Sequence, residues 1–163
     1  MRTGHHPPNV MGSAGGAVGP AVQALAAQAA MAALGGELDL GLELGERACL
    51  RGIALPHHVV IPAPSFSLGV ARMLADDLTG AISLLQSERL RIEQLGDPLL
   101  AIRPATALVI ALYLAGHWDD TLVEADSILG ACADTGTGVG RLTARVLTGL
   151  VAHHRGHDAL AET

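Results

Sequence analysis

The chain has 163 residues, 50% of them hydrophobic and 2% aromatic, and its formal net charge is -6. The high apolar content excludes a disordered protein, and the negative charge argues against nonspecific nucleic-acid binding, which needs a clustered basic face. All 10 basic residues are arginine. A phosphate-loop lysine, a Schiff-base lysine and a Ser/Lys dyad are therefore excluded.

The N-terminal segment, residues 1–16, has too little periodic apolar sequence to fold. It contains a His-His-Pro-Pro run at 5–8 and several glycines. We expect a disordered leader here and a helical-repeat domain over residues 17–163.

Apolar residues at three- and four-residue steps predict seven helices along the rest of the chain. Their expected ranges are 20–34, 39–53, 66–76, 79–95, 99–115, 119–134 and 140–154, and an eighth helix begins at Asp158. Asp97, Ser65 and Asp119 are the expected N-caps. Pro104 either starts its helix or bends it, because proline inside a helix removes a backbone hydrogen bond.

One short pattern recurs every 40 residues and marks the turn between two helices. Its copies begin at Leu34, Leu74, Leu114 and His154. A fixed interval of this size is typical of stacked helical hairpins. Gly36, Gly116 and Gly156 allow the left-handed backbone that closes a helix. We therefore predict an all-α, tetratricopeptide-like, right-handed superhelix of about four hairpins, with the last hairpin truncated.

The first helix of a hairpin is apolar on nearly every side, whereas the second carries one apolar stripe beside acidic residues. A helix that is apolar all round needs cover on all sides. First helices should therefore form the inner layer and second helices the outer one, or the reverse if the concave face holds a ligand. We expect Leu114 and Trp118 to be buried at the third turn. On this expectation, alanine at either position would destabilise the chain by about 2–5 kcal/mol.

Arg89 and Arg91 lie beside Glu88 and Glu93 on one predicted helix. Opposite charges three or four residues apart on a helix form ion pairs. We interpret this group as a solvated helix face and not as a binding site.

Cys49 and Cys132 show no metal or disulfide spacing and fall in apolar helical segments, which is typical of reduced thiols in a cytoplasmic protein. The apolar run at 105–116 is shorter than the roughly 20 residues that span a bilayer. We expect a cytoplasmic location and no membrane partner.

The densest set of potential metal ligands is His153, His157 and Asp158, and the two histidines have the spacing of a helical zinc site. A turn is expected between them, and it would break that register. The glycine-rich runs 12–19 and 136–141 have no preceding strand and no lysine, so we expect no nucleotide cofactor. No paired carboxylates or Ser/His/Asp group favours an enzyme.

Residues from about 68 to 161 resemble the helical arm of the large ATP-binding LuxR-type transcriptional regulators. The motifs that carry the resemblance are Leu114-Ala115-Gly116-His117-Trp118-Asp119-Asp120, Gly140-Arg141-Leu142 and Arg155-Gly156-His157-Asp158-Ala159-Leu160. In that family an ATPase precedes a tetratricopeptide-like sensor arm, and a DNA-binding domain comes last. The sequence shows neither a phosphate loop nor a basic recognition helix, so the resemblance implies the arm alone, without ATP hydrolysis or direct DNA binding.

The resemblance implies a noncatalytic binding or sensor module, a fragment of such a regulator, that takes up a protein or a small-molecule inducer. Trp118, His117 and Arg141 lie in the resembling motifs and are the candidate partner-binding residues. Two alternatives stay open. One is a stand-alone tetratricopeptide-like scaffold, which could also pair with itself through an uncapped C-terminal edge. The more remote one is a small metal-dependent enzyme that uses the ligands named above.

Overall fold

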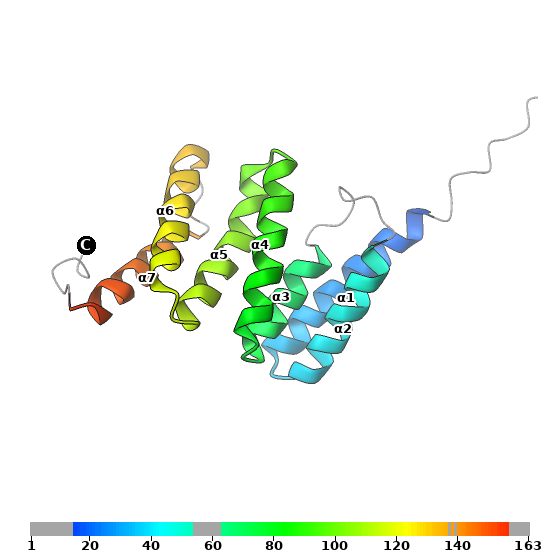
Figure 1. The fold of residues 1–163 in the computed structure, drawn as a ribbon. Helices are drawn as coiled ribbons and strands as arrows, with labels where there is room; N and C mark the ends of the chain where they lie inside the picture. Colours follow the sequence, from blue (N-terminus) through cyan, green and yellow to red (C-terminus); the bar gives the residue numbers. More distant parts are fainter. Residues whose placement is uncertain (1–14, 54–62, 137, 139, 157–163) are drawn as a thin grey trace, which may run out of the picture.

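The computed structural model describes residues 15–53, 63–136, 138 and 140–156, and all regular structure in these ranges is helical. The helices are α1 (Gly15–Leu34), α2 (Leu38–Gly52), α3 (Pro64–Leu74), α4 (Leu78–Gln94), α5 (Pro98–Leu114), α6 (Trp118–Thr135) and α7 (Arg141–His154). They stand side by side in a row that runs from α1 and α2 at one end to α6 and α7 at the other (Figure 1). The prediction of an all-α fold is confirmed.

Consecutive helices pack as hairpins, with α1 on α2, α3 on α4, and α5 on α6. The first helix of each following hairpin packs on the one before it. Thus α3 contacts both α1 and α2, and α7 contacts both α5 and α6. Among the described residues, α4 makes no close backbone contact with α2 or with α6. First helices are therefore covered on more sides than second helices, which agrees with their more apolar sequences.

The predicted boundaries of α2 to α7 lie within two residues of the observed ones. α1 differs, because it begins at Gly15 and not near Pro20. Gly15 and Gly16, which the sequence places in the leader, are therefore helical. Val22 in this helix is fully buried. Once the helical turn that contains Val22 is packed, extending α1 toward its N-terminus costs little free energy.

Asp97 caps α5 as predicted. Its Oδ1 accepts hydrogen bonds from the backbone N–H groups of Leu99 at 3.1 Å and Leu100 at 3.2 Å. α5 then continues through Pro104 to its last residue, so a helix start at Pro104 is excluded.

Ser65 and Asp119 are not N-caps, and this part of the prediction is wrong. The cap positions are Ala63 and His117, which place Ser65 and Asp119 in the first turns of α3 and α6. In α3 the helix starts earlier because Pro64 already has the helical φ at the first position. In α6 the carboxylate lies where the helix dipole favours negative charge.

The turns within the hairpins share one backbone conformation at one repeat position. Gly36, Asp76, Gly116 and Gly156 have φ values of 88°, 66°, 77° and 73°. This left-handed region satisfies the last carbonyl groups of the preceding helix. The prediction that Gly36, Gly116 and Gly156 take this conformation is confirmed.

The second helices bury their residues in one shared register. The buried sets are Gly41, Gly45 and Ala48 in α2, Ala81, Leu85 and Glu88 in α4, and Thr121, Ala125 and Ile128 in α6. Each set lies 40 residues after the one before it. In α2 the buried residues are small, and this lets α3 approach closely. A Cβ added to Gly45 would lie only 3.0 Å from the Cδ1 atom of Leu68, so a larger residue at position 45 would push the two helices apart. The 40-residue interval therefore describes packing as well as turns.

The core of the third hairpin differs from the prediction at one residue. Leu108 and Leu112 of α5 are 0% and 2% exposed, but Leu114 is 54% exposed and Trp118 is half-buried. Successive helical residues are about 100° apart around the axis, so Leu114 points almost opposite to Leu112. The expectation that Leu114 is buried is wrong for this reason.

The eighth helix expected from Asp158, and with it the second half of the fourth hairpin, lies outside the described residues. So do residues 1–14 of the expected leader. No helix in the described ranges combines the length and the apolar character that crossing a bilayer requires. Cys49 is half-buried and Cys132 is buried, and no disulfide joins the two.

Candidate functional site

Trp118, at the start of α6, packs against the end of α7. Its indole ring is stacked on the imidazole ring of His154, with centroids 5.2 Å apart and planes inclined by 10°. The hydroxyl oxygen of Tyr113, near the end of α5, lies 3.0 Å from Nε2 of His154, within hydrogen-bond distance. The three rings thus join the third hairpin to the helix that follows it. This contact gives Trp118 a structural role at the junction.

The other two candidate partner-binding residues lie at different places. His117 is exposed and immediately precedes Trp118. Arg141 follows Gly140, where an added Cβ would lie 3.1 Å from the Cγ2 atom of Ile128. Ile128 is about 15 Å along α6 from Trp118, at the usual rise per helical residue. The structure therefore brings His117 and Trp118 together but does not place Arg141 beside them.

The possible metal ligands can be followed only in part, because His157 and Asp158 lie outside the described residues. His153 is exposed on the last turn of α7, with its ring centroid 6.1 Å from that of His154. Within the described ranges, no three or more His, Cys, Asp or Glu side chains are grouped so that they could hold a metal ion. The metal-dependent enzyme therefore gains no geometric support from this part of the chain.

Glu88 on α4 is 2% exposed, so the interpretation of its surroundings as a solvated face is wrong. Its Oε1 accepts a hydrogen bond from Nη2 of Arg91 at 2.6 Å, and its Oε2 accepts one from Nε of Arg91 at 2.9 Å. The hydroxyl of Ser65 on α3 donates to the same Oε2 at 2.7 Å. The hydrogen bond to Glu88 raises the pKa of Arg91, so the guanidinium stays charged. The group ties α3 to α4.

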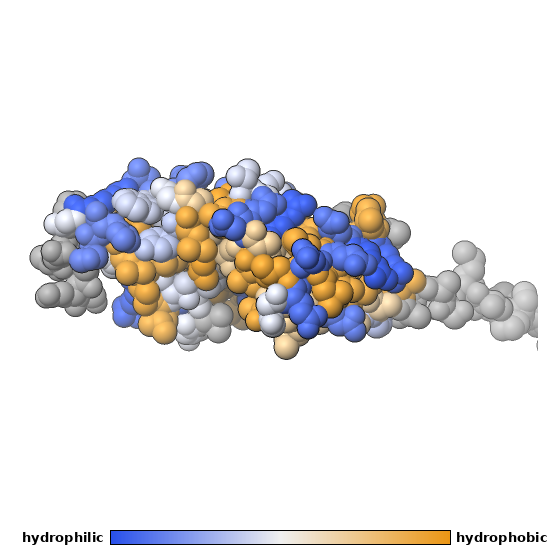
Figure 2. All heavy atoms as spheres, turned by 90° about the horizontal axis from the view of Figure 1, so that it is seen from below, coloured by the Kyte–Doolittle hydropathy of each residue, from blue (hydrophilic) through white to orange (hydrophobic). Residues whose placement is uncertain are grey.

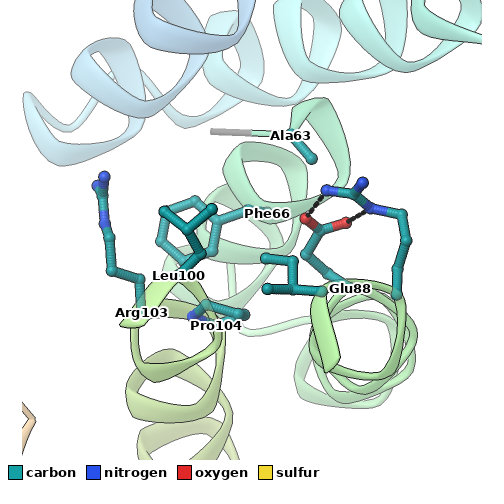
Figure 3. A pocket seen from close by; sticks show the side chains of 8 residues that line it. Ala63, Phe66, Glu88, Leu100, Arg103 and Pro104 are labelled. Atoms are coloured by element: carbon teal, nitrogen blue, oxygen red, sulfur yellow. Dashed lines mark hydrogen bonds and ion pairs between the residues drawn. The ribbon is translucent and has the colours of Figure 1, made fainter. Parts of the chain in front are cut away.

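A small cavity adjoins this ion pair between α3, α4 and α5 (Figure 3). The residues that line it are Ala63, Phe66, Glu88, Arg91, Ile92, Leu100, Arg103 and Pro104. The Arg103 guanidinium carbon lies 5.4 Å from the centroid of the Phe66 ring, within cation–π range. The cavity volume is about 20 Å³, which is space for roughly one water molecule. We therefore read this cavity as a packing feature of the second and third hairpins.

A second groove, of about 130 Å³, lies between α4, α5 and α6. Arg89 is on its wall, and its Nη1 lies 3.3 Å from carboxylate oxygens of both Glu93 and Glu124. The Nε atom of Arg89 and Oε2 of Glu124 are buried and have no hydrogen-bond partner among the described residues. Burial raises the pKa of Glu124, while the charge of Arg89 opposes that shift. The groove is polar at this end and offers room for a few water molecules.

Exposed leucines recur at the hairpin turns. Leu34, Leu74 and Leu114 occupy the same position 40 residues apart and are 67%, 40% and 54% exposed. We call these three residues the leucine ladder. The turns that follow them lie along the lower edge of the row in Figure 1, and the view from below in Figure 2 shows hydrophobic residues gathered along the middle of the molecule with hydrophilic ones beside them.

Acidic residues lie near the leucine ladder, at the starts of the second helices. Glu37, Asp39 and Asp76 are exposed, and no ion pair joins them to another described residue. Asp119 is paired with Arg155, with 2.7 Å between Oδ1 and Nη2. The helix dipole favours carboxylates at these positions. The turn edge therefore combines exposed apolar side chains with unpaired negative charge.

Sequence reasoning did not single out the leucine ladder. Leucine opens the first three copies of the 40-residue repeat and is exposed in all three, whereas the expectation for Leu114 places it in the core.

No protein-family model matches the chain, and neither a curated protein nor a solved structure matches it. The resemblance to LuxR-type helical arms therefore depends on the sequence motifs alone.

Proposed function

We propose that this chain is a noncatalytic binding module built as a tetratricopeptide-like, right-handed superhelix of helical hairpins, and that it acts in the cytoplasm. The observation that carries this proposal is the leucine ladder. The same repeat position holds a leucine in three successive hairpins, Leu34, Leu74 and Leu114, and the side chain is exposed in each of them. Hydrophobic surface is therefore exposed at a constant interval. Exposed apolar surface that is contiguous and bordered by polar groups marks interaction sites, and we propose that the leucine ladder forms such a surface.

The partner we propose for the leucine ladder is a protein segment that carries both apolar and basic residues. Glu37, Asp39 and Asp76 supply the charge that basic residues would meet. A small-molecule inducer is less well supported. The cavities between α3, α4 and α5 and between α4, α5 and α6 measure about 20 and 130 Å³. Sites for drug-sized ligands usually measure about 300–1,000 Å³.

The wider context we propose is the sensor arm of a LuxR-type transcriptional regulator, of which this chain would be a fragment. The motifs around Trp118, Arg141 and Arg155 support it. The coding sequence that follows codon 163 tests this part of the proposal. A helix-turn-helix domain in the same reading frame is the expected result, and an unrelated gene there would instead favour the stand-alone scaffold.

The binding function itself is tested with a peptide-display library selected on the full chain. The test variant carries Leu34→Ser, Leu74→Ser and Leu114→Ser. A matched control variant carries Leu50→Ser, Leu90→Ser and Val123→Ser at residues that are 70%, 50% and 70% exposed on the second helices. Circular dichroism verifies that both variants keep their helices.

We expect selected peptides that contain aliphatic residues together with Lys or Arg. They should bind the control variant like the original chain and bind the ladder variant at least about tenfold more weakly, a loss of about 1.4 kcal/mol. Peptides that bind all three proteins equally, or a selection that enriches no sequence, would refute the proposed role of the leucine ladder.

A further inference from the structure

The junction between the second and third hairpins is packed more loosely than the junction before it. α3 packs against both α1 and α2, whereas α5 packs mainly against α4 and makes only a few close backbone contacts with α3. The cavity of about 20 Å³ and the groove of about 130 Å³ described above both border this junction. Neighbouring units of a stacked fold are held together by the interface that they share. A thin interface here therefore leaves these two hairpins freer to move against each other.

One ion pair joins α4 to α6 across this junction. Nη1 of Arg89 on α4 lies 3.3 Å from Oε2 of Glu124 on α6, and it lies equally far from Oε1 of Glu93 on its own helix. The side chains of Arg89 and Glu124 are 22% and 15% exposed, so both charges are largely withdrawn from water. Because Glu93 is on the same helix, Arg89 keeps one partner when Glu124 moves away.

Two polar atoms of this ion pair are buried without a hydrogen-bond partner, Nε of Arg89 and Oε2 of Glu124. Nη1 of Arg89 therefore approaches Oε2 at ion-pair distance without forming a hydrogen bond. A buried polar atom that lacks a partner loses the free energy of its hydration. Burial also raises the pKa of Glu124, because the charged form is less favoured here than in water. Moving α6 away from α4 returns both atoms to water, so the charged pair favours a wider junction.

The preceding junction has a neutral pair at the same repeat positions. Cys49 and Leu84 precede Arg89 and Glu124 by 40 residues. All four residues are half-buried, as the shared register requires. Apolar residues can commonly replace a buried ion pair without loss of stability. Stacking of the hairpins therefore does not require a charged pair at these positions.

We propose that the junction between the second and third hairpins is a hinge, which opens when water reaches Arg89 and Glu124. α5 and α6 move together against α3 and α4, about the turn at Gly96, whose left-handed backbone has a φ of 74°. Leu74 ends α3 and Leu114 ends α5, so opening changes the spacing of the leucine ladder. The hinge goes beyond the proposed binding function and is tested without any partner, so either can fail alone.

Distances between spin labels on the second helices measure the hinge. The label pair Ser83→Cys with Val123→Cys spans the second junction, and the pair Glu43→Cys with Ser83→Cys spans the first. All three positions are exposed and lie 40 residues apart. Cys49→Ala and Cys132→Ala remove the natural thiols from every labelled chain. Double electron–electron resonance then gives the distribution of distances for each label pair in the full chain.

Three variants of the labelled chain separate the charged pair from the rest of the junction. Glu124→Gln removes the buried carboxylate charge. Asp126→Asn is the matched control, because it neutralises an exposed carboxylate on the same helix. The double variant Arg89→Ala with Glu124→Leu gives the second junction the same residue types that the labelled chain has at the first. Circular dichroism verifies that the helices are kept.

Without further changes, and with Asp126→Asn, we expect a broader distribution across the second junction than across the first. It should extend at least about 2 Å beyond its main distance, the size of helix shifts at packed interfaces. Glu124→Gln should narrow this distribution, and the double variant should make it as narrow as the one across the first junction. Narrowing by either variant, with Asp126→Asn unchanged, supports the hinge.

Three results would overturn the inference. Equal widths at the two junctions in the labelled chain would show that the second junction is no looser than the first. A width that neither Glu124→Gln nor the double variant reduces would show that the charged pair does not favour opening. Equal narrowing by Asp126→Asn and Glu124→Gln would assign the effect to the overall charge of α6.

Discussion

Asp76 and Gly116 occupy the same position in successive turns, and both have left-handed backbone, with φ of 66° and 77°. Left-handed backbone destabilises the folded chain by about 1–2 kcal/mol for an L-residue with a side chain. This penalty is smaller for aspartate and absent for glycine. We predict that Asp76→Gly raises the free energy of unfolding by up to about 1 kcal/mol, because the lost strain exceeds the added freedom of the unfolded chain.

Gly116→Ala is the reciprocal change and should lower the free energy of unfolding by about 1 kcal/mol. Urea denaturation of both variants measures the two differences. An Asp76→Gly chain that unfolds at lower urea than the original would show that the Asp76 side chain does more for the turn than its backbone strain costs.

The ring contact between Trp118 and His154 gives a second prediction. Trp118→Ala removes the stacked indole and leaves a gap between α6 and α7, so we expect a loss of about 2–3 kcal/mol in the free energy of unfolding. His117→Ala is the control, since this neighbour is exposed, and its effect should stay within about 0.5 kcal/mol. Equal effects of the two substitutions in urea denaturation would contradict the structural role of Trp118.

Leu112 and Leu114 have similar sequence surroundings and opposite exposure. Leu112→Ala should cost about 2–5 kcal/mol, because a fully buried leucine leaves a cavity. Leu114→Ala should cost less than about 1 kcal/mol, since the side chain already contacts water. Thermal unfolding by circular dichroism distinguishes the two, and a larger loss for Leu114→Ala would mean that the end of α5 is packed differently.

The boundaries of α2 to α7 could be predicted because local signals mark them, such as the Asp97 side chain that caps α5 and the glycines with left-handed backbone. The exposure of individual residues was harder to predict than the helix boundaries. Whether Leu114 points into the core depends on where Leu108 and Leu112 pack. The burial of Glu88 depends on Ser65, which lies 23 residues earlier in the sequence. Contacts of this kind arise when hairpins stack, and no local pattern records them.

Glu124 should make stability depend on pH. Burial raises the pKa of Glu124, so the folded chain holds this proton more tightly than the unfolded chain does. The contribution of Glu124 to stability therefore falls as the pH rises from its unfolded-state pKa through its folded-state pKa. Glu124→Gln removes this titration, and Arg89 keeps Glu93 as a partner at 3.3 Å.

We expect the urea midpoint of Glu124→Gln, relative to that of the original chain, to be higher at about pH 7 than at about pH 4, which brackets ordinary carboxylate titration. A difference that stays constant over this range, or that changes in the opposite direction, would show that burial does not dominate the titration of Glu124.

The central claim is that the second helices bury the same side at a 40-residue interval. Thiol-labelling rates of single cysteines, in a chain with Cys49→Ala and Cys132→Ala, test it most directly. One set of substitutions is Ala48→Cys, Ala81→Cys and Ala125→Cys, at residues that are all 0% exposed. The other set is Glu43→Cys, Ser83→Cys and Val123→Cys, at exposed positions 40 residues apart. We predict that every member of the first set reacts at least about tenfold more slowly than every member of the second. Overlapping rates between the two sets would contradict the repeating arrangement.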